Sequence, residues 1–199
     1  NVGSQDQVAS AFGGLNRIEF LRNGAVDVVP VVCSKDRRKE LNRHLMLFFT
    51  GIARNAPEVA KSQIDNMVHR KIELGRMREM VDEALDILQD ETRPIAEFGE
   101  LLDLSWRCKR TLSDRISTPE IDRTYDEARA AGAIGGKILG AGGGGFMLLF
   151  APPEKQAAIR ARMERLVHLP FEFEDRGSCV IFPQSVPVLA LGNAEQVGS

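Results

Sequence analysis

The sequence has few of the residues that stabilise small secreted or metal-binding proteins. Its 199 residues include three cysteines and three histidines. The cysteines Cys33, Cys108 and Cys179 lie far apart and form no CxxC pair, and the histidines have no ligand-like spacing. The sequence therefore predicts no metal site and no disulfide framework. We expect buried free thiols and a reducing, cytoplasmic location.

The net charge is also small, and the apolar runs are short. The formal net charge is −2 and the pI is about 6.0, so nothing indicates binding to nucleic acid or to an anionic membrane. No apolar run approaches the roughly 20 residues that a membrane-spanning helix needs. The first residues lack the basic-then-apolar pattern of a signal peptide. With 43 % hydrophobic and 27 % charged residues, the composition is that of a globular protein with a core.

Glycine, by contrast, is concentrated in one short segment between two apolar runs. Ordering consecutive glycines is costly in backbone entropy, and this cost is explained if several positions need positive φ or if a ligand lies against the backbone. Successive N–H groups in such a loop can form an anion-binding concavity. The sequence therefore predicts a phosphate- or ligand-binding loop made of Gly140, Ala141, Gly142, Gly143, Gly144 and Gly145.

Two other interpretations of this glycine loop can be weighed. A flexible hairpin tip would also tolerate glycines. A dinucleotide-binding loop needs a helix directly after the glycines and an acidic residue about 20 positions further on. Here the apolar run FMLLF follows, which favours a strand. The pattern therefore argues against a dinucleotide site and leaves the hairpin tip as the alternative.

The remaining pattern predicts an α+β protein with an antiparallel sheet. Strand signals surround the Asn23-Gly24 turn and the glycine loop, and amphipathic helical patterns occupy the middle of the chain. We expect strands over 15–21, 26–32, 44–51, 133–139, 146–151, 171–175 and 178–182. We expect helices over 4–12, 34–43, from 57 onward, and over 66–89, 94–112, 118–131 and 153–167.

Three segments carry a resemblance to a known superfamily. Residues 135–152 (GGKILGAGGGGFMLLFAP) are similar to the third signature motif of the GHMP kinases, which include galactokinases, homoserine kinases and mevalonate kinases. Residues 3–20 (GSQDQVASAFGGLNRIEF) resemble the sugar-kinase segment that carries the catalytic aspartate, which maps onto Asp6. This segment and residues 45–63 are most similar to D-glycero-D-manno-heptose 7-phosphate kinases and the related fucokinase domains.

This resemblance implies a domain organisation. Residues 34–183 would be a GHMP kinase C-terminal domain, an antiparallel sheet with helices packed on one side. Residues 1–33 would be a remnant of the N-terminal kinase domain, and 184–199 a tail. The N-terminal half of the family, whose Pro-x-x-x-Gly-Leu-Gly-Ser-Ser loop wraps the ATP phosphates and helps to hold Mg²⁺, has no match here. We therefore expect a truncated or split enzyme, inactive alone, that self-associates or binds the missing half.

The resemblance also implies an activity and roles for individual residues. The expected reaction is ATP-dependent phosphorylation of the anomeric hydroxyl of a heptose 7-phosphate. Asp6 would be the general base, although a carboxylate there could instead cap its helix. Gly51 and Arg54 lie in a strand-to-helix segment where ligand contacts gather, and Arg54 is the candidate for the sugar phosphate. Lys137 could neutralise phosphate or be an exposed strand lysine.

Other assignments remain open from sequence. We expect Lys109 and Arg110 to lie on a solvated helix face. The acceptor could be galactose, fucose or mevalonate in place of a heptose phosphate. The chain could also be a non-catalytic domain that binds a sugar or a partner chain. A basic site for a distal phosphate distinguishes a heptose phosphate acceptor from the other acceptors, because neutral hexoses do not need one.

Overall fold

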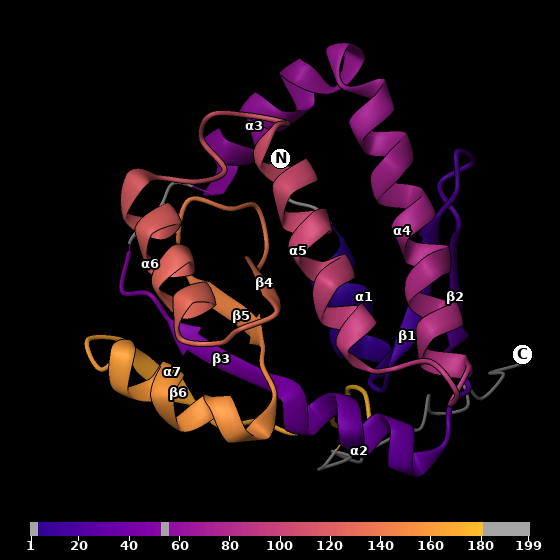
Figure 1. Cartoon of the computed structure of the whole chain (residues 1–199). Helices are drawn as coiled ribbons and strands as arrows, with labels where there is room; N and C mark the ends of the chain where they lie inside the picture. Colours follow the sequence, from indigo (N-terminus) through magenta and orange to yellow (C-terminus); the bar gives the residue numbers. More distant parts are fainter. Residues whose placement is uncertain (1–3, 53–55, 181–199) are drawn as a thin grey trace, which may run out of the picture.

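The computed structural model describes residues 4–52 and 56–180 and shows helices packed around a small antiparallel sheet (Figure 1). The helices are α1 (Gln5–Phe12), α2 (Lys35–His44), α3 (Ala56–Asn66), η1 (Met67–His69), α4 (Lys71–Gln89), α5 (Ala96–Arg110), α6 (Pro119–Ala130), η2 (Pro153–Lys155) and α7 (Gln156–Arg162). The strands are β1 (Asn16–Phe20), β2 (Val26–Pro30), β3 (Leu45–Phe49), β4 (Gly135–Ile138), β5 (Phe146–Phe150) and β6 (Val167–Leu169).

The strands form two separate sheets. β1 and β2 make an antiparallel hairpin, and the other four strands pair in the order β4-β5-β3-β6, all antiparallel. The glycine loop joins neighbouring strands β4 and β5, so the expected strand on each side of it is confirmed. A dinucleotide-binding loop is thereby excluded, because a strand and not a helix follows the glycines.

The main core lies on one face of the four-stranded sheet. Side chains alternate between the two faces of a strand, so Met46 and Phe48 of β3 point to the same side as Met147 and Leu149 of β5. These residues and Ile138 of β4 pack against buried side chains of α5, α6 and α7, which include Trp106, Ile121, Tyr125 and Ile159. The expected α+β architecture with helices against one side of an antiparallel sheet is confirmed.

Helix α5 lies along β4 at the edge of the sheet. The two backbones approach so closely that a Cβ on Gly135 would clash with the carbonyl oxygen of Gly99. The first glycine of the Gly135-Gly136 pair is therefore required by helix–strand packing. A helix placed in this way also covers an edge strand that would otherwise expose unpaired backbone groups.

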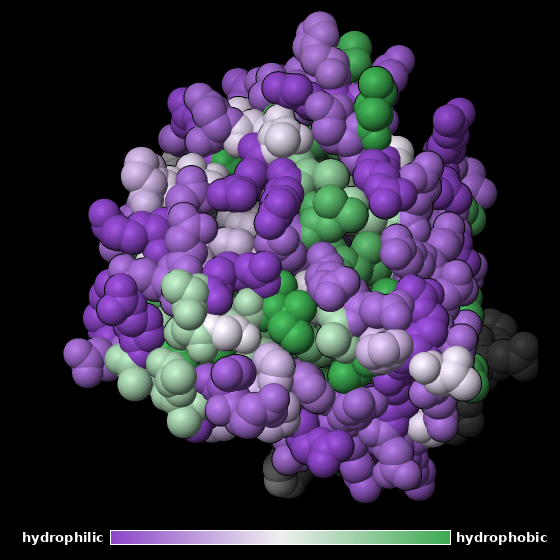
Figure 2. Space-filling model, viewed as in Figure 1, coloured by the Kyte–Doolittle hydropathy of each residue, from purple (hydrophilic) through white to green (hydrophobic). Residues whose placement is uncertain are grey.

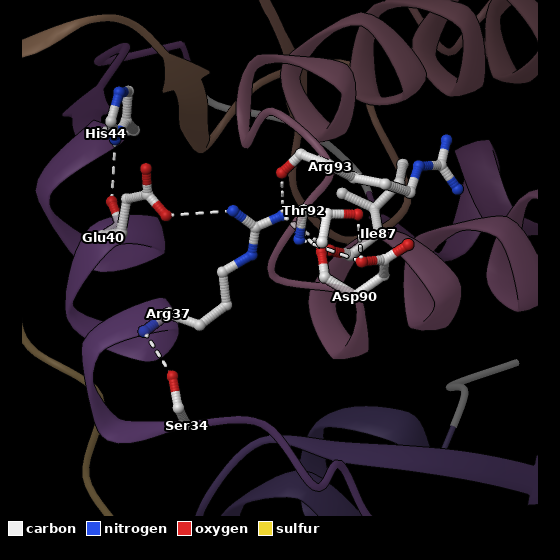
Figure 3. A network of polar contacts seen from close by, with 8 residues as sticks. All are labelled: Ser34, Arg37, Glu40, His44, Ile87, Asp90, Thr92 and Arg93. Carbon is white, nitrogen blue, oxygen red and sulfur yellow. Dashed lines mark hydrogen bonds and ion pairs between the residues drawn. The ribbon is translucent and has the colours of Figure 1, made fainter.

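Arg37 of α2 fixes the turn between α4 and α5 (Figure 3). Its side chain is 4 % exposed, and its Nη2 donates hydrogen bonds to the carbonyl oxygens of Ile87 at 2.6 Å and Arg93 at 2.8 Å. Its Nη1 forms an ion pair with Glu40 at 3.0 Å. A buried guanidinium needs such partners. Arg37 thereby attaches α2 to the end of α4 and the start of α5.

An apolar groove runs between α4 and α5, where Figure 2 shows hydrophobic side chains gathered on an otherwise hydrophilic face. Its volume is about 210 Å³. It is lined by Met77, Met80, Val81, Ala84, Phe98, Leu101, Leu102 and Ser105.

Within the described ranges, no helix is long and apolar enough to cross a bilayer.

Two expected helices are wrong in extent. The helix expected over 66–89 begins only at Lys71, because Met67–His69 form a 3₁₀ turn and Arg70 leaves the helical region with φ −119° and ψ 30°. The helix expected over 153–167 ends at Arg162, because Val167–Leu169 pair with β3. Tertiary pairing here overrides a helical sequence pattern.

The strands expected over 171–175 and 178–180 are absent, and residues 181–182 lie outside the described ranges. Backbone groups of this segment bond instead to Asn42 and to the end of α1. The cysteines are free as expected, but none of them is fully buried. Cys33 and Cys108 are half-buried, and Cys179 is exposed because it lies on this irregular surface segment.

Candidate active site

The glycine loop adopts a backbone conformation that few other residues could follow. All five of its glycines have positive φ, from 68° at Gly140 to 150° at Gly144. L-residues other than glycine rarely adopt such angles. The glycines are therefore required by the path of the loop.

The middle of the loop is buried against two other segments. A Cβ on Gly142 would lie 2.7 Å from the carbonyl oxygen of Ile116, and a Cβ on Gly144 would lie 2.5 Å from that of Ile52. The N–H of Gly143 also donates a hydrogen bond to the Ile116 carbonyl oxygen at 2.8 Å. The loop is packed and hydrogen-bonded, so the alternative of a flexible hairpin tip is wrong.

Polar side chains fix the two ends of the loop. Thr50, directly after β3, donates hydrogen bonds from its backbone N–H at 2.9 Å and its Oγ1 at 2.8 Å to the carbonyl oxygen of Gly145. At the other end, Lys109 Nζ donates to the carbonyl oxygen of Gly140. Gln63 of α3 donates to the carbonyl oxygen of Ala141. Helices α3 and α5 and the end of β3 thus meet at the loop.

Lys109 corrects an expectation. The sequence placed it on a solvated face, but its side chain is 8 % exposed and points toward the loop, where it also lies 3.5 Å from the carbonyl oxygen of Ile138. Arg110 is half-buried and forms an ion pair with Asp122 at 2.8 Å. Lys109 follows the buried Trp106 by three residues, a helical spacing that places both on the buried stripe. The three-residue spacing from Trp106 was the sequence signal for the burial of Lys109.

Lys137 of β4 lies close to the loop in sequence and is half-buried. It pairs with Leu148 across the strands, on the sheet face opposite to Ile138. Burial lowers the pKa of its ammonium below the ordinary value, because a charged group loses hydration in apolar surroundings. Lys137 is therefore not a fully exposed strand lysine.

Asp6 lies in the first turn of α1 and is exposed. The residue at the N-cap position is Ser4, and Asp6 does not cap the helix. A carboxylate in the first helical turn interacts favourably with the helix dipole. Asp6 lies on α1, which precedes the β1–β2 hairpin, whereas the glycine loop joins β4 and β5 of the four-stranded sheet.

The segment between β3 and α3 is described only in part. Gly51 is exposed and has a φ of +71°, which glycine accommodates without strain. Its neighbour Thr50 holds the glycine loop, so this strand end lies against the loop. Arg54, the candidate for a distal phosphate, lies outside the described residues.

These features define a class of protein. Residues 91–168 match the family model described as the C-terminal domain of GHMP kinases, and this stretch includes α5, α6 and both strands that flank the glycine loop. The chain therefore contains a GHMP kinase C-terminal domain, as the resemblance implied.

Individual relatives narrow the comparison. A D-glycero-α-D-manno-heptose 7-phosphate kinase from Campylobacter jejuni is 35 % identical over 77 % of this chain and 45 % of its own length. The solved structure of a D-glycero-D-manno-heptose 1-phosphate kinase from Bacteroides thetaiotaomicron is 27 % identical, with a TM-score of 0.61 over 89 % of this chain and 48 % of that one. The mevalonate kinase of L. major, 18 % identical with a TM-score of 0.66 over 90 % of this chain and 55 % of its own, shares the fold.

The chain thus spans about half the length of the heptose kinases that it matches.

Proposed function

We propose that this chain forms the C-terminal part of an ATP-dependent sugar kinase that phosphorylates the anomeric hydroxyl of D-glycero-D-manno-heptose 7-phosphate. The observation that carries the proposal is the packed, buried glycine loop, which begins three residues after Lys137 of β4, in a chain 35 % identical over 77 % of its length to a heptose 7-phosphate kinase. Successive glycines leave backbone without intervening side chains, and in this proposal the backbone atoms of the loop that are not packed against Ile116 and Ile52 face the ligand.

The proposed reaction is a transfer of the γ-phosphoryl group. The acceptor hydroxyl oxygen forms a bond to the γ-phosphorus while the bond to the ADP oxygen breaks, and the hydroxyl proton passes to the Asp6 carboxylate. Such a reaction depends mainly on positioning and charge stabilisation, so one well-placed carboxylate can serve as the base. The exposure of Asp6 leaves it open to an acceptor.

The remaining roles follow from charge and position. The glycine loop shapes the acceptor and phosphate side of the site, and Lys137 supplies positive charge near it. We assign the distal phosphate of the sugar to Arg54, because a guanidinium binds phosphate oxygens through paired N–H groups. Gly51 allows the turn that leads to Arg54.

We assign the binding of the triphosphate and Mg²⁺ mainly to the N-terminal half of GHMP kinases, which this chain does not match. Among the described residues, no three His, Cys, Asp or Glu side chains gather into a group that could hold a metal. In this proposal residues 1–33 complete the N-terminal kinase domain and residues 34–183 form the C-terminal one. A chain without the first half would then lack turnover.

A panel of acceptors tests the proposed function. A protein of the relatives' full length that contains this chain is assayed with ATP and heptose 7-phosphate, galactose, fucose or mevalonate. We expect heptose 7-phosphate to give the highest kcat/KM. Fucose is the second candidate, because a fucokinase/GDP-fucose pyrophosphorylase of Arabidopsis thaliana is 28 % identical over 81 % of this chain.

Two results would contradict the proposal. Absence of phosphoryl transfer to any of the four acceptors would indicate a non-catalytic binding domain. Turnover by the 199-residue chain alone would show that the second half is not required.

A further inference from the structure

Helix α1, which carries Asp6, depends on contacts outside itself. It has eight residues and none of them is buried. Isolated helices of this length are unstable in water, and tertiary packing normally stabilises them. Just after the helix, the N–H of Gly14 donates a hydrogen bond to the carbonyl oxygen of Glu174 at 2.7 Å. Glu174 belongs to residues 171–178, which we call the brace.

The brace also satisfies the end of α1. The backbone N–H of Ser178 donates hydrogen bonds to the carbonyl oxygens of Ser10 at 3.0 Å and Ala11 at 3.2 Å. The last four carbonyl oxygens of a helix have no partner within the helix. A segment more than 160 positions away in sequence thus completes the hydrogen bonding of the catalytic helix.

Glycines allow this contact between two backbones. A Cβ on Gly177 would clash with the carbonyl oxygen of Ala11, and a Cβ on Gly13 would clash with the backbone of Arg176. Gly13 also has a φ of +63°. Any larger residue at Gly177 must therefore push the brace and α1 apart.

The brace is itself held by α2. The side chain of Asn42 donates to the carbonyl oxygen of Phe171 at 3.3 Å and accepts from the N–H of Phe173 at 3.2 Å. Arg38 forms an ion pair with Asp175, and its guanidinium lies 5.6 Å from the centre of the Phe173 ring. Contacts from the single helix α2 therefore hold the brace at Phe171, Phe173 and Asp175.

Helix α2 is in turn fixed to the helices around the glycine loop. Arg37 attaches it to the turn that begins α5 (Figure 3). Helix α5 carries Lys109, which holds Gly140. A continuous set of contacts thus runs from the loop through α5 and α2 to the brace and α1. We propose that the brace positions Asp6 relative to the glycine loop, with Gly177 and Asn42 as positioning residues. The proposal rests on the proposed function only for the role of Asp6.

The structural part is tested by hydrogen exchange in the full-length protein. Gly177→Ala should reduce the protection of the amides of α1 by about tenfold or more, because the helix loses hydrogen bonds at its end. Asn42→Ala, which loosens the brace without a clash, should give a smaller change in the same amides. Gly75→Ala on α4 is the matched control, because nothing lies within 4 Å of its Cβ position. Unchanged protection of α1 in both test variants would overturn the proposal.

The functional part is tested by kinetics on the same three proteins. We expect kcat to fall in Gly177→Ala and, less strongly, in Asn42→Ala, while KM for ATP stays near the parent value in both. Gly75→Ala should keep the parent kcat. If Gly177→Ala failed to fold, Asn42→Ala would decide both parts. Reduced protection of α1 with unchanged kcat would support the brace and contradict the catalytic role of Asp6. A fall in kcat with unchanged protection in both variants would overturn the brace.

Discussion

Lys109 Nζ donates a hydrogen bond to the carbonyl oxygen of Gly140, so helix α5 sets the point at which the glycine loop begins. The lysine side chain is 8 % exposed, and its ammonium also lies 3.5 Å from the carbonyl oxygen of Ile138. A buried cation is tolerated only where hydrogen-bond acceptors surround it. These two carbonyl oxygens belong to the end of β4 and to the loop itself.

Replacement of Lys109 by Met should therefore loosen the loop. We expect the free energy of unfolding to fall by about 1.5–3 kcal/mol, the range for a hydrogen bond to a charged group, and kcat of the full-length protein to fall about tenfold or more. Lys109→Arg should restore part of the free energy of unfolding and part of kcat. Lys71→Met, at an exposed lysine of α4, is the control. Urea unfolding and steady-state kinetics measure the changes; equal values for Lys109→Met and Lys71→Met would contradict this role.

Asp6→Asn should remove the proposed general base without disturbing the fold. We expect kcat to fall by about 10² or more, because general-base contributions are commonly 10²- to 10⁴-fold. KM for ATP should stay the same, since the carboxylate is assigned to the acceptor. Asp27→Asn, an exposed carboxylate on β2, serves as the control. An Asp6→Asn enzyme with the parent turnover would refute the assignment.

Arg54→Ala should act on the acceptor alone. Loss of a charge-assisted bond to the distal phosphate costs roughly 1.5–3 kcal/mol, which corresponds to about a 10- to 150-fold rise in KM for the phosphorylated sugar. KM for ATP should not change. Arg22→Ala in the β1–β2 turn is a control at an exposed arginine. If KM for ATP rose and that for the sugar phosphate did not, Arg54 would belong to the nucleotide site.

Lys137→Met should stabilise the fold and impair function. Burial lowers the pKa of Lys137 from its ordinary 10.5, so the charged form is less favourable in the folded state than in the unfolded one. Methionine removes this cost, and each kcal/mol gained raises Tm by about 2–4 °C. If the ammonium faces phosphate, KM for the sugar phosphate or for ATP rises at the same time.

The pH dependence of this effect has a defined sign. Below the lowered folded-state pKa the lysine is charged in both states, and the cost of its burial is fully present. As the pH rises from the lowered folded-state pKa toward 10.5, the unfolded state binds more protons, so the parent protein gains stability relative to Lys137→Met. Thermal unfolding of both proteins at pH 7 and pH 10 measures this. A difference in Tm that widens with pH would contradict the burial of the ammonium.

Gly144→Ala should destabilise the loop from within. The new Cβ would lie 2.5 Å from the carbonyl oxygen of Ile52, and a φ of 150° is strained for alanine. We expect a loss of about 1–3 kcal/mol in the free energy of unfolding. Gly75→Ala, in a helix with open space, should instead gain about 0.5–1 kcal/mol. Chemical denaturation compares the two; a neutral Gly144→Ala would indicate a loop that rearranges freely.

Local pattern was sufficient for much of the fold. The Asn23-Gly24 turn predicted the β1–β2 hairpin, and the apolar runs on either side of the glycines predicted β4 and β5. Both predictions were possible because such patterns are encoded in residues that are neighbours in sequence. The run GAGGGG marked the loop, since no other composition follows a path of successive positive φ values. The sequence motif also indicated the GHMP kinase C-terminal domain.

Only the tertiary structure decided how the site is held. Lys109 looked like one charge among several on an amphipathic helix, and its burial depends on where α5 meets β4. Residues 171–175 alternate like a strand, but the available backbone partners were Asn42 and the end of α1. Hydrogen bonds between segments more than 100 positions apart leave no period in the sequence. Residue pattern therefore determined the elements and the glycine loop, whereas packing between distant segments determined which side chains support them.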